Sequence, residues 1–222
     1  MSVQELPSAR PTQPWRLPLD GLALFEGDSA APRLSHYFLP GLVLSGKRVL
    51  FLDGANCADP RLMARLARQR NIPFAEFSRR LQIARAFTCF QFTELIARVP
   101  QFISGFRAEV LIVTAFPELY FDQDIRDWDA RAAFEQALRH LRCWACQREP
   151  PLAVAVFTSS ARPAPSAARR GFLPGVRASA TALWRFEAGP EGKLALLPGP
   201  RESTLPSRAA WAETPASRRS VR

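Results

Sequence analysis

Lysine is almost absent from this sequence, although the chain is strongly basic. Lys47 and Lys193 are the only lysines, so arginine supplies nearly all of the 30 positive charges that oppose 20 acidic residues. A GC-rich genome, which encodes arginine readily, explains the shortage of lysine but not the net charge of +10. A positive field of this kind favours polyanionic partners such as nucleic acids.

Histidine and cysteine, which bind transition metals, are also scarce, with two and four copies. Cys143 and Cys146 have the C-x-x-C spacing of a zinc half-site or a redox pair. No second pair completes a tetrahedral site, so we interpret them as small apolar residues of a helix in a reducing compartment. The acidic residues between positions 122 and 129 lack the spacing and the glycine of a calcium-binding loop. We therefore expect no metal site.

Long apolar runs are missing as well. No stretch reaches the ~18 apolar residues of a membrane span, and no signal-peptide pattern opens the chain. The sequence therefore predicts a soluble cytoplasmic protein. We expect a Pro-rich N-terminal arm over 1–20, one core domain over 21–199 and a disordered basic tail over 200–222.

Short apolar runs alternate with helix-compatible segments along the core. We expect strands over 22–25, 48–53, 81–84, 110–113 and 152–157, and helices over 59–70, 88–99 and 129–147. Asp59-Pro60 and Thr88 are suited to start the first two of these helices. A long flexible loop over 159–175 precedes two antiparallel strands over 181–186 and 193–197. The pattern predicts an α/β fold, with a mostly parallel twisted sheet, helices on both faces and a C-terminal antiparallel strand pair.

Several motifs, in a consistent order, resemble the ATPase core of the RecA recombinase family over about residues 20–198. Residues 49–53 (VLFLD) precede the helix start at 59–62 (DPRL) and the segment 84–91 (ARAFTCFQ), which is similar to a strand-to-helix junction of that family. Residues 181–186 (TALWRF) resemble the strand that follows the second DNA-binding loop of the family. The resemblance implies a RecA-like fold for the core domain.

The segment that aligns with the phosphate-binding loop departs from the pattern G-x-x-x-x-G-K-[ST]. It begins at Gly27 but has Pro32, Arg33 and Leu34 at the glycine, lysine and hydroxyl positions. Proline has no N–H for a phosphate, arginine does not replace lysine in a tight cradle, and leucine cannot bind Mg²⁺. Asp28 adds a negative charge where a phosphate would lie.

Two further catalytic positions of the family also differ. The resemblance places Thr114 at the carboxylate of the central strand and Ala55 at the glutamate that orients the attacking water. Catalysis of phosphoryl transfer consists mainly of positioning and charge neutralisation, and these substitutions remove both. We predict that Gly27, Ala55, Thr114 and the 32–34 segment form a degenerate nucleotide site. We expect no enzymatic activity and no cofactor.

Two groups of residues are candidates for binding partners. The region that corresponds to the second DNA-binding loop contains Arg162, Arg169, Arg170, Phe172 and Arg177. Its arginines are candidates for phosphate contacts and its phenylalanine for stacking on bases; a solvated loop without a partner is the alternative. In the N-terminal arm, Trp15 and Leu17 lie among prolines and are candidates for docking on a protein partner.

The function that we expect is a non-hydrolysing accessory protein of DNA recombination or repair. It would act as an adaptor that binds DNA and a protein partner, namely a recombinase, a repair polymerase or a sibling subunit. One alternative is a pure protein-interaction module of a DNA-damage response, of the polymerase-accessory or cell-division-inhibitor type. Another is a subunit that completes a composite ATP site with its partner. Fold alone does not separate these functions.

Overall fold

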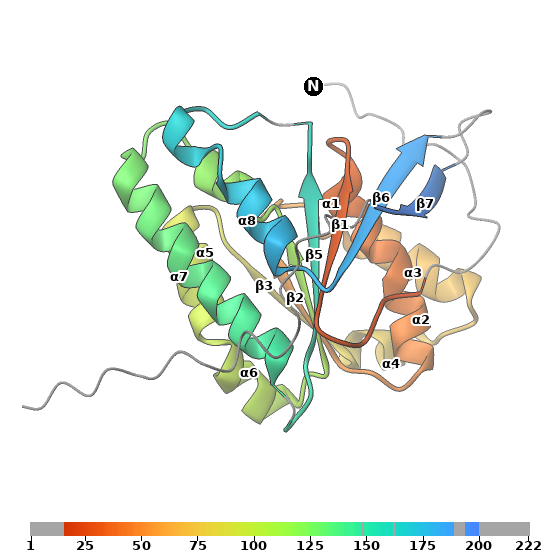
Figure 1. Ribbon diagram of the computed structural model, residues 1–222. Coiled ribbons are helices and arrows are strands. Elements are labelled where there is room, and N and C mark those ends of the chain that lie inside the picture. The colour runs from red at the N-terminus through yellow and green to blue at the C-terminus, as the bar shows by residue number, and fades with distance from the viewer. Residues whose placement is uncertain (1–15, 148, 162, 189–193, 200–222) are drawn as a thin grey trace, which may run out of the picture.

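Seven strands form one sheet in the computed structural model, which describes residues 16–147, 149–161, 163–188 and 194–199 (Figure 1). The predicted tail over 200–222 and most of the predicted arm lie outside the described residues. The elements follow in the order β1 (Leu22–Gly27), α1 (Ala31–Leu34), the 3-10 helix η1 (Ser35–Phe38), α2 (Leu39–Leu44), β2 (Val49–Asp53), α3 (Pro60–Gln69), α4 (Phe74–Arg79), β3 (Leu81–Arg85), α5 (Cys89–Ala97), α6 (Val99–Phe106), β4 (Val110–Thr114), η2 (Glu118–Phe121), α7 (Asp127–Cys146), β5 (Ala153–Ser159), η3 (Ala167–Arg169), α8 (Phe172–Ser179), β6 (Ala182–Ala188) and β7 (Leu194–Pro198).

The strands lie in the order β3-β2-β4-β5-β1-β6-β7. Every neighbouring pair is parallel except β6 and β7, which are antiparallel. The predicted fold class, an α/β fold with a mostly parallel sheet and a C-terminal antiparallel strand pair, is therefore confirmed. The sheet ends at β3 on one side and at β7 on the other, so within the described residues β3 has only β2 as a neighbour.

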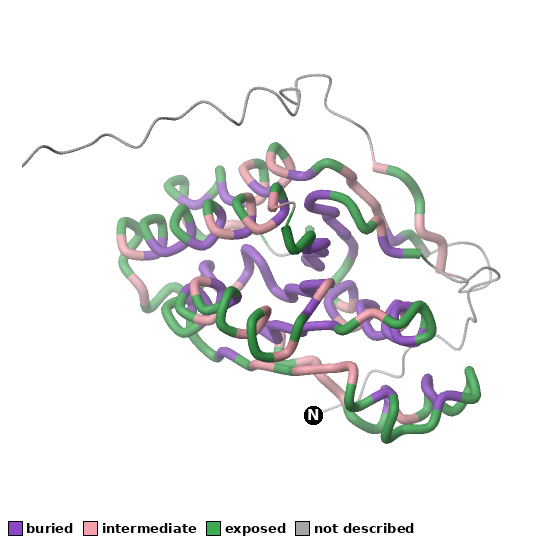
Figure 2. Tube along the Cα trace, turned by 90° about the horizontal axis from the view of Figure 1, so that it is seen from below, coloured by how far each residue is buried: buried purple, intermediate pink, exposed green. Residues whose placement is uncertain are grey.

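The sheet separates two hydrophobic cores, because successive side chains of a strand point to opposite faces. In β1, Leu22 and Leu24 belong to the core beneath α5, α7 and α8, whereas Ala23 and Phe25 belong to the core beneath α1, α2 and α3. Figure 2 shows the resulting pattern of buried strands and of helices that are exposed on their outer sides. Burial on both faces explains why the strands are continuous apolar runs in the sequence.

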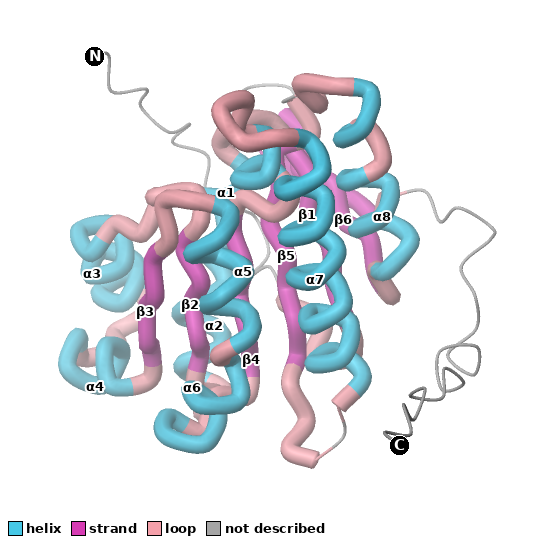
Figure 3. The backbone as a smooth tube through the Cα atoms, turned by 90° about the vertical axis from the view of Figure 1, so that its left-hand side faces the viewer, coloured by secondary structure: helices cyan, strands magenta, loops and turns pink. Residues whose placement is uncertain are grey.

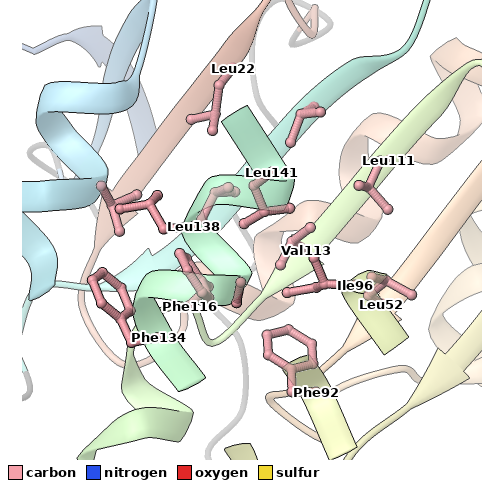
Figure 4. Packing of buried hydrophobic residues seen from close by; sticks show 14 of the residues in the cluster. Leu22, Leu52, Phe92, Ile96, Leu111, Val113, Phe116, Phe134, Leu138 and Leu141 are labelled. Atoms are coloured by element: carbon pink, nitrogen blue, oxygen red, sulfur yellow. The ribbon is translucent and has the colours of Figure 1, made fainter. Parts of the chain in front are cut away.

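Helices cover both faces, as predicted, and the predicted starts of two helices are confirmed. Asp59 caps α3 by accepting the N–H groups of Arg61 and Leu62, and Thr88 caps α5 by accepting that of Gln91. Figure 3 shows α5 and α7 in front of the sheet. Figure 4 shows how Phe92 and Ile96 of α5 and Phe134, Leu138 and Leu141 of α7 pack with residues of the strands.

The prediction of a flexible loop over 159–175 is wrong for its second half. Residues 167–169 form η3, and α8 begins at Phe172. The ring of Phe172 stacks on that of Phe134 in α7, with 4.2 Å between the ring centroids. The hydrophobic effect therefore holds this segment on the domain.

Candidate functional site

The carboxyl ends of the parallel strands meet at one edge of the sheet, where open α/β sheets commonly bind their ligands. The register pairs Gly27 of β1 with Ser159 of β5, and Asp53 of β2 with Thr114 of β4. The N–H of Ala55 lies 3.3 Å from the hydroxyl of Thr114. The predicted degenerate nucleotide residues therefore lie at this edge, and two of them, Ala55 and Thr114, are in contact.

The loop after β1 satisfies its own hydrogen-bonding groups. The N–H of Ala30 donates to the carboxylate of Asp28 at 2.8 Å, and the N–H of Ala31 donates to the carbonyl of Asp28 at 3.1 Å. Pro32 has no N–H to offer. Three successive positions of the loop therefore present no donor to a phosphate, and a carboxylate lies beside them.

Gly27 lies in a tightly packed position. A Cβ atom at this position would lie 3.0 Å from Cβ of Ala31 and 3.1 Å from Cβ of Phe186. Its carbonyl accepts both the N–H and the hydroxyl of Ser160, at 2.9 and 3.0 Å. The loop is thus bound to β5 and packed against β6 by the protein's own atoms.

Arg33, which occupies the lysine position of the family pattern, is held by an ion pair. Its Nη2 lies 2.7 Å from Oδ2 of Asp59, and both side chains are about one-third exposed. The N–H of Leu62, assisted by that of Arg61 and by the Arg33 guanidinium, lowers the pKa of the Asp59 carboxyl below its ordinary value. Through this ion pair Arg33 connects α1 to the start of α3. The next residue, Leu34, is buried in the core between α1 and the sheet.

His36 lies directly behind this ion pair and is fully buried. Its Nε2 accepts the N–H of Asp59 at 3.3 Å, so the ring proton lies on Nδ1, which donates to the carbonyl of Arg33 at 2.7 Å. Burial lowers the pKa of His36 below its ordinary value. The neutral imidazole therefore links Arg33 and Asp59 by hydrogen bonds, in addition to their ion pair.

Asp53 is a fully buried carboxylate at the centre of the edge. It accepts the N–H groups of Cys57 and Ala58 at 3.0 and 2.9 Å, Nε of Arg85 at 3.0 Å and the hydroxyl of Thr114 at 3.3 Å. Its oxygens are thus occupied by donors from β3, β4 and the loop after β2. Burial, reinforced by the negative charge of Asp53, raises the pKa of the Cys57 thiol to about 12. That thiol is protonated at neutral pH and is not a nucleophile.

The predicted DNA-binding loop is only partly available. Arg162 lies outside the described residues, and Arg170 is exposed. Arg169 is 2% exposed. It donates to the carboxylate of Asp127 at 2.7 Å and to the carbonyl groups of Tyr120, Asp122 and Ile125. This arginine holds the turn before α7, so its prediction as a flexible DNA contact is wrong.

Two further residues of the predicted DNA site also have structural roles. Phe172 is buried against Phe134 and is not free to stack on a base. Arg177 forms two hydrogen bonds with Glu26, which is completely buried. A group of arginines in a Pro-rich and Ser-rich segment does not reveal that the partners of these arginines lie elsewhere in the chain.

Of the two predicted partner-binding residues, the structure describes only Leu17. Trp15 lies outside the described residues. Leu17 is 8% exposed and belongs to the core shared by Phe25 and Leu42. Its prediction as a docking residue is therefore wrong, and the packed core begins before residue 21. The physical reason is that an apolar side chain next to the first strand is buried against the sheet and helices of the same chain.

Two surfaces that the structure leaves open were not predicted from the sequence. At the β3 edge, Ile83, Phe87 and Phe90 are 40%, 66% and 52% exposed. On α3, Arg61, Arg65 and Arg68 are exposed on the outer side of the helix. The spacing i, i+4, i+7 of these arginines was a readable signal, whereas the exposure of the aromatic residues depends on which strand forms the edge.

The chain matches no protein-family model, and no curated protein sequence is significantly similar to it. Within the described residues, no three histidine, cysteine or acidic side chains are grouped as a metal site. In the same residues, no helix combines the length and the apolar composition of a membrane span. Cys143 and Cys146 are free and exposed on α7.

Proposed function

We propose that this protein is a non-hydrolysing accessory protein of DNA recombination or repair, which acts in the cytoplasm as an adaptor between DNA and a protein partner. The observation that carries the proposal is the self-occupied loop after β1. Asp28 binds the amides of Ala30 and Ala31, and Asp59 binds Arg33. To use these amides and this guanidinium, a nucleotide would have to displace Asp28 and break the ion pair with Asp59.

The resemblance to the RecA family supports the choice of process. In that family the same sheet edge holds ATP, and here the side chains at the edge bind one another. Such a domain retains its outer surfaces for binding while its catalytic edge contributes to stability. A recombinase, a repair polymerase or a sibling subunit is the kind of protein partner that we propose.

The β3 edge is the surface that best fits a protein partner. A strand without a neighbour presents unpaired N–H and C=O groups, to which an extended segment of another protein can add. Ile83, Phe87 and Phe90 would supply apolar contacts beside these groups. Arg85, at the end of β3, is about one-third exposed and would favour an acidic residue in the added segment.

A pure protein-interaction module is the second candidate. It is favoured by Arg169 and Arg177, because both are engaged in ion pairs and do not serve the predicted DNA site. This candidate resembles the degenerate RecA-like proteins that assist a mutagenic polymerase or inhibit cell division. It differs from the adaptor in one measurable property, the absence of DNA binding.

The first test is a titration of a fluorescent ATP analogue with Mg²⁺, together with the anisotropy of labelled DNA in the presence and absence of Mg²⁺-ATP. We expect no nucleotide binding, no hydrolysis, and DNA binding that ATP does not change. Micromolar nucleotide affinity or any hydrolysis above background would contradict the proposal. Absence of DNA binding at low salt would favour the pure protein-interaction module.

The protein partner is tested by co-purification of the full chain from cells, followed by mass spectrometry for recombinases and repair polymerases. The variant Phe87→Ala/Phe90→Ala should lose the partner. Phe74→Ala is a matched control, because Phe74 is 50% exposed on α4, away from the end of β3. Equal retention by both variants would exclude the β3 edge as the docking surface.

A further inference from the structure

Positive charge is dense in the segment that forms α3 and α4. Residues 60–81 contain six arginines and one glutamate, whereas residues 89–147 contain eight acidic and six basic residues. The first segment forms α3 and α4, and the second forms α5, α6 and α7, which pack on opposite faces of the sheet (Figure 3). The segment that forms α3 and α4 is therefore strongly basic, whereas the segment from α5 to α7 has nearly balanced charge. On the same face as α5 and α7, the segment of η3 and α8 adds the exposed Arg170 and the ion-paired Arg169 and Arg177.

Arg61, Arg65 and Arg68 form a row along the outer side of α3, which we call the α3 arginine row. Leu62, Met63, Leu66 and Ala67 of the same helix are buried and fix its orientation on the sheet. With a rise of about 1.5 Å per residue, the row extends over about 10 Å. Arg70 and Arg79, which are also exposed, extend the basic surface beyond α3.

These five arginines form no ion pair within the described residues. The two nearest acidic residues in the sequence are already used, since Asp59 pairs with Arg33 and Glu76 with Arg80. Two exposed arginines on the opposite face do pair with a glutamate one turn away, as Arg98 does with Glu94 and Arg131 with Glu135. Like charges at i, i+4 destabilise a helix. The α3 arginine row is thus a charge arrangement that the fold itself leaves uncompensated.

We infer that the α3 arginine row, with Arg70 and Arg79, binds the phosphate backbone of a nucleic acid. A guanidinium matches the geometry of a phosphate with two parallel hydrogen bonds, which the ammonium group of lysine cannot do. A row of about 10 Å is long enough to contact neighbouring phosphates of one strand. The surface lies on the opposite face of the sheet from α8, and Arg169 of η3 and Arg177 of α8 have structural roles.

The choice of a nucleic acid as the polyanion rests on the proposed adaptor function. The position of the surface rests only on the exposed, unpaired arginines. Contacts of this kind are made to the backbone and carry no sequence information. Binding is therefore expected to be strongly dependent on salt and nearly independent of DNA sequence.

The test is the anisotropy of labelled single-stranded and duplex DNA of mixed sequence at NaCl concentrations between about 50 and about 300 mM. Over about this range the affinity of phosphate-binding proteins for DNA falls steeply, because counterions are released on binding. The test variant is Arg61→Gln/Arg65→Gln/Arg68→Gln. The control variant is Arg107→Gln/Arg126→Gln/Arg139→Gln, which removes the same charge from exposed arginines of the opposite layer. Circular dichroism and thermal unfolding verify that both variants are folded.

We expect the test variant to lose affinity at least ~10-fold and to show a shallower dependence of log K on log salt by about 2 to 3. The control variant should lose less than ~3-fold. Equal losses in the two variants would overturn the inference, because net charge alone would then explain binding. The variant Arg61→Lys/Arg65→Lys/Arg68→Lys should bind more tightly than the glutamine variant but less tightly than the wild type, because lysine keeps the charge and loses the two parallel hydrogen bonds. Affinity no higher than that of the glutamine variant would contradict an electrostatic contact with phosphates.

Two further measurements distinguish a nucleic acid from a membrane surface, and DNA binding from nucleotide binding. Co-sedimentation with vesicles of phosphatidylserine and phosphatidylcholine that exceeds binding to DNA would overturn the inference in favour of a membrane surface. An effect of Mg²⁺-ATP on DNA affinity would contradict the proposed function. Such an ATP effect would not contradict DNA binding by the α3 arginine row, provided that the test variant, and not the control variant, lost affinity both with and without ATP.

Discussion

The guanidinium of Arg177 in α8 forms two hydrogen bonds with the carboxylate of Glu26 in β1, at 2.6 and 2.9 Å. The two residues are 151 positions apart in the sequence. Glu26 is completely buried, whereas the side chain of Arg177 is 32% exposed. The pair fixes α8 on the domain and gives a buried carboxylate the partner that it needs.

Removal of Arg177 should therefore destabilise the fold. We expect Arg177→Ala to lower the free energy of unfolding by roughly 3 kcal/mol, because Glu26 would lose its ion pair inside the protein. Arg170→Ala, which removes an exposed arginine nearby, should change it by less than about 0.5 kcal/mol. Urea unfolding of both variants gives the comparison. The double variant Glu26→Leu/Arg177→Leu should recover part of the loss, and a double variant less stable than Arg177→Ala would argue against the unpaired carboxylate as the cause.

Gly27 offers a second test, which separates packing from phosphate binding. Gly27→Ala should destabilise the protein by about 1–3 kcal/mol, since the new methyl group would press on Ala31 and Phe186. Gly41→Ala is the control, because a Cβ at Gly41 in α2 meets no atom within 4 Å. It should stabilise the protein by about 0.5–1 kcal/mol. Thermal unfolding with opposite shifts would support the packing role, and an unchanged midpoint for Gly27→Ala would contradict it.

The strands were the most predictable part of the fold. Residues 110–113 and 152–157 are apolar without interruption because both faces of these strands are buried, and this pattern is visible locally. Between β1 and β2, where Pro32 and Pro40 lie, the sequence predicted a helix-compatible stretch that Pro40 and Gly41 would bend or stop. In the structure both prolines lie in the first turn of a helix, where a missing N–H costs little.

The candidate site was less predictable, for a physical reason. The loss of the lysine and of the Mg²⁺ hydroxyl is readable from Arg33 and Leu34 alone. The role of Arg169 is not, because it depends on the carbonyl groups of Tyr120, Asp122 and Ile125, which only the tertiary fold brings together. An arginine in a Pro-rich segment looks the same in a sequence whether it is a solvated phosphate contact or a buried support.

His36 should make stability depend on pH. Burial lowers its pKa below the ordinary value of 6.5, so the unfolded chain takes up a proton that the folded chain does not. Stability should therefore fall as pH decreases below about 6.5, by at most about 1.4 kcal/mol per pH unit for this one group. The Asp59 carboxyl, whose pKa is lowered from 3.8, loses its contribution only at more acidic pH.

Urea unfolding at several values between pH 8 and pH 5 measures this dependence. His36→Gln should flatten the curve, because the only titrating group of the α1–α3 junction in that range is removed. His140→Gln is the control, because it removes a histidine from α7, away from the α1–α3 junction. If the two variants gave the same slope, the dependence would not originate at His36.

The four cysteines should differ in their rates of alkylation, and the rate at Cys57 measures whether the sheet edge around Asp53 opens in solution. Burial raises the pKa of Cys57 to about 12, together with the charge of Asp53, and raises that of Cys89 to about 11. At pH 8 about one in a thousand or fewer of these thiols is a thiolate, which is the reactive form. Cys143 and Cys146 are exposed on α7.

Mass spectrometry of the native protein with N-ethylmaleimide should therefore show two rapid additions, which Cys143→Ser/Cys146→Ser abolishes. A rapid third addition that maps to Cys57 would mean that the cluster around Asp53 opens in solution, and the edge could then admit a ligand.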